Sequence, residues 1–263
     1  MASKTVRNPA VAGMFYPAEP ARLRATVEQY LQSAESRGSM PKAIIVPHAG
    51  YVYSGPIAAS AYARLAAAAD IIKRVVLLGP AHRVSFRGLA LPSCQSFMTP
   101  LGAVPVDQEA VANITHLPQV LVMDDAHIAE HSLEVHLPFL QTVLSEFALV
   151  PLAVGQASAV EVGEVLECLW GGAETLIVIS SDLSHYYDYE TARRMDITTS
   201  QAIEQLRPED IGYEQACGRI PINGLLYIAR KRGMHAKTID LRNSGDTAGS
   251  RDQVVGYGAY VFE

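Results

Sequence analysis

Cysteine is scarce in this 263-residue chain, which has only Cys94, Cys168 and Cys217. Three cysteines so far apart argue against a disulfide framework and favour a reducing compartment. We therefore expect a cytoplasmic protein, in which a functional cysteine acts as a thiolate and not as half of a disulfide.

An excess of basic residues is also missing, since 21 lysines and arginines stand against 27 aspartates and glutamates and the formal net charge is −6. This balance does not provide the positive surface that binds polyanions, so we expect no nucleic-acid partner.

Long apolar runs are absent as well. No stretch approaches the roughly 20 apolar residues of a membrane span, and residues 1–17 lack the apolar core of a signal peptide. We expect no membrane partner either.

Short apolar runs rich in β-branched residues alternate with longer segments of helical periodicity. The strand-like runs lie at residues 43–46, 75–78, 149–154 and 176–179. The helix-like segments lie at residues 57–69, 107–115, 133–145 and 159–170. This alternation predicts an α/β fold, with a mostly parallel sheet covered by helices. No linker or repeat marks a boundary, so we expect a single domain over residues 1–263.

The C-terminal part has a different character. Helices are expected at residues 195–206 and 222–232, followed by strand-like stretches at 236–241 and 254–262. We expect these two strands to join the same sheet as an antiparallel edge.

Three of the predicted strands run directly into segments that carry histidine or aspartate. His48 follows the first strand, His82 the second, and Asp182 and His185 the fourth. Because the ligand crevice of an open α/β sheet lies at the carboxyl ends of its strands, we expect these side chains to converge on one site. The spacing of Asp182 and His185 also predicts that the carboxylate fixes the tautomer of the ring.

A further cluster of ionisable residues reads EHSLEVH at residues 130–136. On a helix, His131 and Glu134 would share one face while His136 points elsewhere. Zinc proteases need His-Glu-x-x-His or His-x-x-Glu-His, and the spacing here fits neither pattern. The cluster is therefore a candidate part of the site but not a protease signature.

Cys217 stands shortly before a helix that is expected to begin around Pro221. A helix N-terminus and the neighbouring Arg219 would both lower the pKa of the thiol and favour the thiolate. The alternative is that Cys217 is a small buried apolar residue without a chemical role.

Eight segments, taken in order, can be compared with known families: RNPAVAGMFYP at 7–17, PHAGYVYSG at 47–55, GPAH at 79–82, TPLG at 99–102, EHSLE at 130–134, SDLSH at 181–185, CG at 217–218 and NSGD at 243–246. As a set they resemble the Memo family, whose prokaryotic members are also called AmmeMemoRadiSam system protein B. The resemblance extends over nearly the whole chain.

The resemblance implies a fold similar to that of class III extradiol ring-cleaving dioxygenases. It also implies a metal pocket built from two histidines and a cysteine, here His48, His82 and Cys217. Those dioxygenases complete their iron site with a glutamate, so ring cleavage is not inherited with the fold. Arg83 stands where some members have a second histidine, and this departure leaves the ligand His82 in place.

The resemblance further implies that His131, Asp182 and His185 belong to the pocket. One function compatible with this set is a metal-dependent oxidoreductase, in which Fe(II) or Cu binds dioxygen or substrate and these three residues move protons. A second is a non-catalytic scaffold that retains the pocket and binds a small molecule or a peptide in it. This scaffold would act with the radical-SAM partners that the name AmmeMemoRadiSam suggests. A zinc hydrolase is the third, because two histidines and a cysteine with an open position also form a catalytic zinc pattern.

Overall fold

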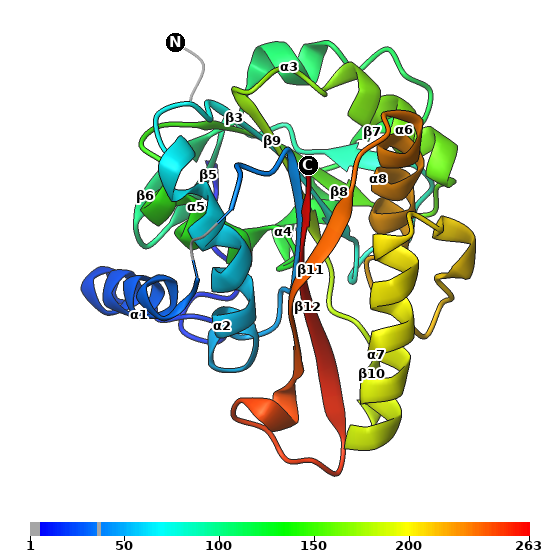
Figure 1. The fold of residues 1–263 in the computed structure, drawn as a ribbon. Helices are drawn as coiled ribbons and strands as arrows, with labels where there is room; N and C mark the ends of the chain where they lie inside the picture. Colours follow the sequence, from blue (N-terminus) through cyan, green and yellow to red (C-terminus); the bar gives the residue numbers. More distant parts are fainter. Residues whose placement is uncertain (1–5, 36–37) are drawn as a thin grey trace.

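The computed structural model describes residues 6–35 and 38–263. Residues 1–17 were expected to lack a signal peptide, and the first five of them lie outside the described residues. Within the described residues, one nine-stranded sheet crosses the molecule and helices cover both of its faces (Figure 1). Eight strands follow one another in the order β10 (His185–Tyr187), β12 (Val254–Phe262), β2 (Ala43–Val46), β9 (Thr175–Ser180), β3 (Arg74–Pro80), β8 (Ala148–Val154), β4 (Leu89–Leu91) and β7 (Val120–Val122). The ninth, β11 (Ala236–Asn243), also pairs with β12.

The centre of the sheet is parallel, because β2, β9, β3 and β8 are joined by parallel ladders. These are the four strands expected from the apolar runs, so the α/β prediction is confirmed. β12 runs antiparallel to β2 and β11 runs antiparallel to β12, which confirms the antiparallel C-terminal edge. The sheet is more mixed than expected, since β4 also runs antiparallel to β8. A small second sheet joins β1 (Val6–Arg7), β5 (Ser96–Thr99) and β6 (Gly102–Pro105).

Alternate residues of the central strands enter two separate hydrophobic cores. Ile44 and Val46 of β2 belong to the core that also contains apolar residues of helices on one face. Ala43 and Ile45 belong to the core on the opposite face. Because both faces of each central strand are covered, the strands read as continuous apolar runs in the sequence.

The helices divide between these two faces. Those that contribute to the first core are α1 (Pro20–Ser33), α2 (Tyr51–Tyr62) and α5 (Leu137–Val143). Those that contribute to the second core are α3 (Gln108–Ala112), α6 (Ala159–Cys168), α7 (Tyr189–Glu204) and α8 (Arg219–Lys231). The short helix α4 (Asp125–Ile128) lies near the small sheet. No helix in the described part of the chain has the length and apolarity needed to cross a membrane.

Two of the expected helical segments contain a 3₁₀ helix. The segment 57–69 lies in α2, which already begins at Tyr51, and in the 3₁₀ helix η1 (Ala63–Ala68) that follows it. The segment 133–145 contains the 3₁₀ helix η2 (Glu134–His136) before α5 begins. Helix α1 was not expected, although Glu19 caps it through two backbone N–H groups and Pro20 occupies its first turn.

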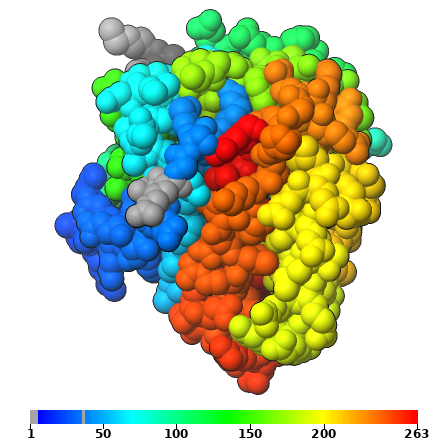
Figure 2. Space-filling model, viewed as in Figure 1, coloured from blue at the N-terminus to red at the C-terminus, as the bar shows by residue number. Residues whose placement is uncertain are grey.

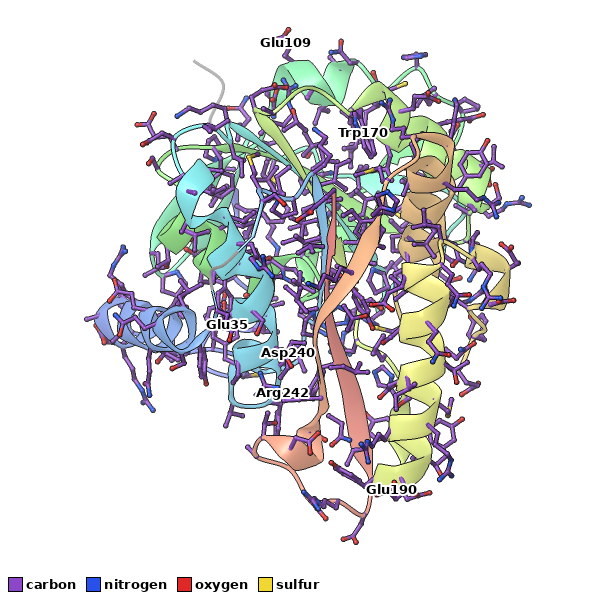
Figure 3. All side chains as sticks on the ribbon, viewed as in Figure 1. Glu35, Glu109, Trp170, Glu190, Asp240 and Arg242 are labelled. Carbon is purple, nitrogen blue, oxygen red and sulfur yellow. The ribbon has the colours of Figure 1, made fainter. Side chains whose placement is uncertain are left out.

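One face of the molecule shows α7 lying beside β11 (Figure 2). On the other side of β11, the Ser60 hydroxyl of α2 donates a hydrogen bond to Asp240 at 2.7 Å. Asp240 also pairs with Arg242 on the same strand, and both side chains are labelled on the ribbon in Figure 3. These contacts hold the long C-terminal hairpin between two helices.

Asp196 of α7 is a buried acid, and it is expected to make stability depend on pH. Burial raises its pKa to about 6, although it accepts a hydrogen bond from the Ser184 N–H at 3.0 Å. Because the folded pKa lies above the unfolded one, its contribution to stability is complete below about pH 4 and is lost as the pH rises through about 6. Asp196→Asn should remove this loss, which is about 2–3 kcal/mol between pH 4 and 7.5.

Urea unfolding of both proteins at several pH values measures this difference. Asp125→Asn provides the control, since Asp125 is an exposed acid in the first turn of α4. Parallel stability curves for the wild type and Asp196→Asn would show that burial does not perturb this carboxyl.

Candidate metal site

Polar residues meet where three neighbouring strands end. His48, His82 and Asp182 each stand two residues beyond β2, β3 and β9, which are adjacent in the sheet. The rings of His48 and His82 have centroids 5.1 Å apart, and an Asp182 carboxylate oxygen lies 4.0 Å from His48 Nε2. The expected convergence of the strand ends is therefore confirmed.

His48 is buried, and both of its ring nitrogens have neighbours. Its backbone N–H donates to Asp182 Oδ1 at 2.7 Å, and its Nδ1 lies 2.6 Å from Ser180 Oγ. Its Nε2 faces the Cys217 sulfur at 3.4 Å. Burial, followed by the neighbouring imidazoles, holds the pKa of His48 well below its usual range, so the ring is neutral.

His82 is oriented by Glu130. Its backbone N–H and its Nδ1 lie 2.6 and 2.9 Å from the two oxygens of this carboxylate. Burial alone would raise the pKa of Glu130, but hydrogen bonds, above all the one with His82, bring it to about 2. Because Nδ1 of His82 donates its hydrogen to the ionised carboxylate, Nε2 is the nitrogen that is free to bind a metal. Histidines that bind metals commonly have such a carboxylate on their other ring nitrogen.

Residues 130–136 do not form one continuous helix, so the expectation that His131 and Glu134 share a helical face is wrong. Glu134 is buried on the other side of this segment, where it pairs with Arg7. It also accepts hydrogen bonds from the backbone N–H groups of Ala10 and Val11 at 2.7 and 3.0 Å. Glu130, and not Glu134, is thus the glutamate that contacts the histidines of the site.

His131 lies against His82 and forms part of the same cluster. The two rings are stacked, with centroids 4.8 Å apart and planes 14° apart, and Phe15 packs on His131 at 4.8 Å. Burial lowers the pKa of His131 to about 4. The potential ligand atoms of His48, His82 and His131 all lie within 4.8 Å of one another, so this group could hold a metal ion.

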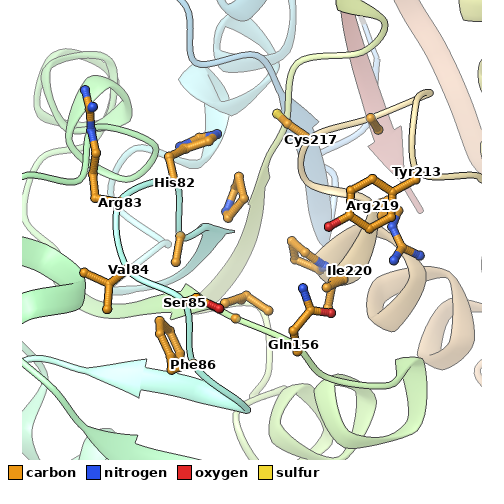
Figure 4. Close-up of a pocket in the computed structure, with 16 residues that line it drawn as sticks. His82, Arg83, Val84, Ser85, Phe86, Gln156, Tyr213, Cys217, Arg219 and Ile220 are labelled. Carbon is orange, nitrogen blue, oxygen red and sulfur yellow. The ribbon is translucent and has the colours of Figure 1, made fainter.

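Cys217 reaches the site because its backbone is tied to the segment after β9. Its N–H donates to the Asp182 carbonyl at 3.3 Å, and the Gly218 N–H donates to Ser181 Oγ at 2.9 Å. A side chain at Gly218 would meet the Ser180 carbonyl oxygen at 2.5 Å, so this close approach requires glycine. Figure 4 shows Cys217 and His82 pointing toward each other at one end of a cavity of about 370 Å³.

The predicted lowering of the Cys217 pKa by Arg219 and the helix N-terminus is wrong. Burial, and then the nearby carboxylate of Asp182, raise the pKa of the thiol. Arg219 does not offset them, because its guanidinium lies over the Tyr213 ring, 4.5 Å from the centroid. Desolvation therefore outweighs the proximity of the α8 N-terminus.

Asp182 and His185 are not paired as expected. Asp182 accepts the His48 N–H, and burial raises its pKa to about 7. His185 Nδ1 lies 2.8 Å from the Leu183 carbonyl, so the backbone sets its tautomer. Both residues nevertheless line one cavity of about 690 Å³, together with His48, His82 and His131.

Two residues of the site were missed by the sequence reasoning. Glu130 was noted without a role, and Ser180, which directly follows the strand expected at 176–179, was not singled out. Their partners stand 48 and 132 residues away in the chain, so no local pattern signals either contact.

Comparisons with known proteins agree with these motifs. A family model described as Memo-like protein matches residues 7–261. The chain belongs to the Memo family. Among curated Memo relatives, a "MEMO1 family protein" of Archaeoglobus fulgidus is 38% identical and one of Aquifex aeolicus is 36% identical, each match covering 98% of this chain and 99% of the relative.

A solved structure, of an uncharacterized protein JW3007 from Escherichia coli K12, is also similar to this Memo chain. It has a TM-score of 0.49 and 15% sequence identity, over 83% of this chain and 99% of that one.

Proposed function

We propose that this Memo-family chain binds one Fe(II) or Cu ion through His48, His82 and Cys217 and serves as a metal-dependent oxidoreductase. The observation that carries the proposal is the position of the Cys217 sulfur, 3.4 Å from the His48 ring, which in turn lies against the His82 ring beyond the ends of adjacent strands. Thiolate and imidazole are ligands suited to Fe, Cu and Zn and not to Mg or Ca.

The distance between Cys217 and His48 fits two ligands of one ion. A thiolate and an imidazole that bind a metal at about 2.3 and 2.1 Å must stand within about 4.4 Å of each other. The observed 3.4 Å between Cys217 Sγ and His48 Nε2 satisfies this limit. Burial raises the pKa of the Cys217 thiol, so a metal ion would displace the thiol proton when it binds.

Ring orientation supports Cys217, and not His131, as the third ligand. An imidazole lone pair lies in the plane of its ring, and the stacked rings of His82 and His131 direct their lone pairs along nearly parallel planes. The rings of His48 and His82, by contrast, cross at 72° and can point to one ion. His131 then faces the site beside the ligands.

A bound Fe(II) or Cu ion would supply redox chemistry and open coordination positions. The chain supplies groups that accept and hold protons. His131 is a neutral base at pH 7, since its pKa is about 4. His185 carries its proton on Nδ1 and has Nε2 free to accept another. Asp182 Oδ1 is occupied by the His48 N–H, so Oδ2 is the atom that can hold a proton.

The alternative function is a scaffold that binds a small molecule or a peptide without turnover. It is favoured by the rim of the cavity of about 690 Å³, where Met14 and Tyr186 are 72% and 70% exposed. Such apolar side chains at a cavity mouth suit ligand recognition. This scaffold would act with radical-SAM partners. We also propose that the protein is cytoplasmic, because its cysteines are few and far apart.

Elemental analysis of anaerobically purified protein, followed by oxygen-uptake assays with catechols and thiols, tests the proposal. We expect about one iron or copper per chain and oxygen consumption. Zinc without oxygen uptake would favour a hydrolase instead. A metal-free protein that binds ligands would favour the scaffold.

A further inference from the structure

We propose that Ser180 is a positioning residue that holds His48 in the tautomer with its proton on Nδ1 and its lone pair on Nε2. This inference rests on the proposed function only in taking His48 as a metal ligand. The tautomer itself is set by hydrogen bonds within the chain.

Ser180 Oγ is the centre of a buried polar network. It lies 2.6 Å from the Ser132 carbonyl oxygen, 2.6 Å from His48 Nδ1 and 2.8 Å from His136 Nε2. All four residues are buried. A serine hydroxyl has one hydrogen to donate and two lone pairs that accept, so these three contacts use its whole capacity.

Only one arrangement of hydrogens satisfies the three contacts. The Ser132 carbonyl can only accept, so the Ser180 hydrogen is directed to it. Both ring nitrogens must then donate to Ser180 Oγ. Since a neutral imidazole has a single N–H, a proton on His48 Nδ1 leaves Nε2 unprotonated.

The far end of the network agrees with this arrangement. If His136 donates from Nε2, its Nδ1 must accept a hydrogen bond. The Tyr62 hydroxyl lies 3.0 Å from that Nδ1 and can donate to it. Burial raises the pKa of Tyr62 well above its usual value, so this hydroxyl keeps its hydrogen.

The opposite tautomer of His48 would leave two buried acceptors in contact. A lone pair on Nδ1 would face the Ser180 oxygen at 2.6 Å without a hydrogen between them, unless the Ser180 hydrogen turned toward Nδ1 and left the 2.6 Å contact between Ser180 Oγ and the Ser132 carbonyl oxygen without one. An unsatisfied buried polar group costs about 1–3 kcal/mol. The network therefore favours the tautomer in which Nε2 presents a lone pair toward Cys217, as a metal ligand requires.

The experiment compares wild type, Ser180→Ala and Ser180→Thr in two measurements. The ¹⁵N shifts of the His48 ring in metal-free protein report which nitrogen carries the proton. Titration with Zn²⁺ against a chromophoric chelator reports metal affinity. In the wild type we expect a protonated Nδ1 and an unprotonated Nε2.

In Ser180→Ala we expect the proton to move to Nε2, because the remaining neighbours of the ring, Cys217 and Asp182, lie on that side. Zn²⁺ affinity should fall about 10–100-fold, as is typical for loss of a partner behind a metal ligand. Ser180→Thr keeps the hydroxyl and should restore both readouts.

Ser200→Ala is the matched control, since it removes another buried serine hydroxyl, bonded to Tyr260 at 2.7 Å, outside the site. It should change neither readout. A wild-type ring protonated on Nε2, or an unchanged ring in Ser180→Ala, would overturn the inference. A tautomer shift in a protein whose wild type binds no metal would support the inference and count against the proposed function.

Discussion

Alanine at His48, His82 or Cys217 is expected to abolish stoichiometric metal binding, whereas alanine at His131 should leave it largely intact. The proposed ligand set consists of the first three, and Cys217 Sγ lies 3.4 Å from His48 Nε2, whereas the His131 ring is stacked on that of His82. Removing a direct ligand should cost more than the roughly 10–100-fold loss of affinity caused by removing an outer partner. Mass-spectrometric metal analysis of anaerobically reconstituted variants measures the effect.

Two exposed residues of the same types provide controls. His116→Ala and Cys168→Ala remove an imidazole and a thiol that lie outside the site, and both variants should keep full metal content. Full metal in Cys217→Ala together with loss of metal in His131→Ala would mean that the three histidines form the ligand set. Full metal in all three ligand variants would place the metal elsewhere.

Replacing Glu134 by alanine is expected to destabilise the fold by about 3–5 kcal/mol, because it leaves Arg7 buried without its counter-charge. The Glu134 carboxylate also accepts hydrogen bonds from two backbone N–H groups and the Tyr16 hydroxyl, and all of these would lose their acceptor. For a chain of this size, the melting temperature should fall by about 10 °C or more.

The Glu134 contacts also affect the position of residues in the candidate metal site. Arg7 donates to the carbonyls of His127 and Glu130, so the same ion pair holds the segment that carries Glu130 and His131. We expect Glu134→Ala to weaken metal binding in addition to stability.

Calorimetry of Glu134→Ala, Arg7→Met and the double variant measures this coupling. Arg7→Met with Glu134→Ala removes both charges, and it should be less destabilised than the sum of the single variants. Glu109→Ala is the control, since Glu109 extends from the surface of α3 (Figure 3). Additive effects would mean that the buried charges act independently.

Elements dominated by local patterning could be predicted well from the sequence. The strands at 43–46 and 254–262 were predicted to the residue, because continuous apolar runs bounded by polar residues are sufficient to define buried strands. Short edge elements gave weaker signals. β4 and β7 have three residues each, and their direction depends on pairing with β8 and with each other.

The segment 133–145 shows where local patterning misleads. Its apolar spacing favours a helix throughout, yet its first residues form a turn and a 3₁₀ helix. The reason is tertiary, since Glu134 turns toward Arg7, which stands 127 residues earlier in the chain.

The sequence by itself determined the α/β architecture, the family motifs and the positions of His48, His82 and Asp182 at strand ends, because period, composition and order along the chain carry that information. Only the tertiary structure decided which partner each side chain has. Glu130 orients His82, Ser180 contacts His48, and Cys217 lies against a histidine 169 residues away. Burial also reversed the expected direction of the Cys217 pKa shift, because desolvation depends on everything packed around a group and not on its neighbours in sequence.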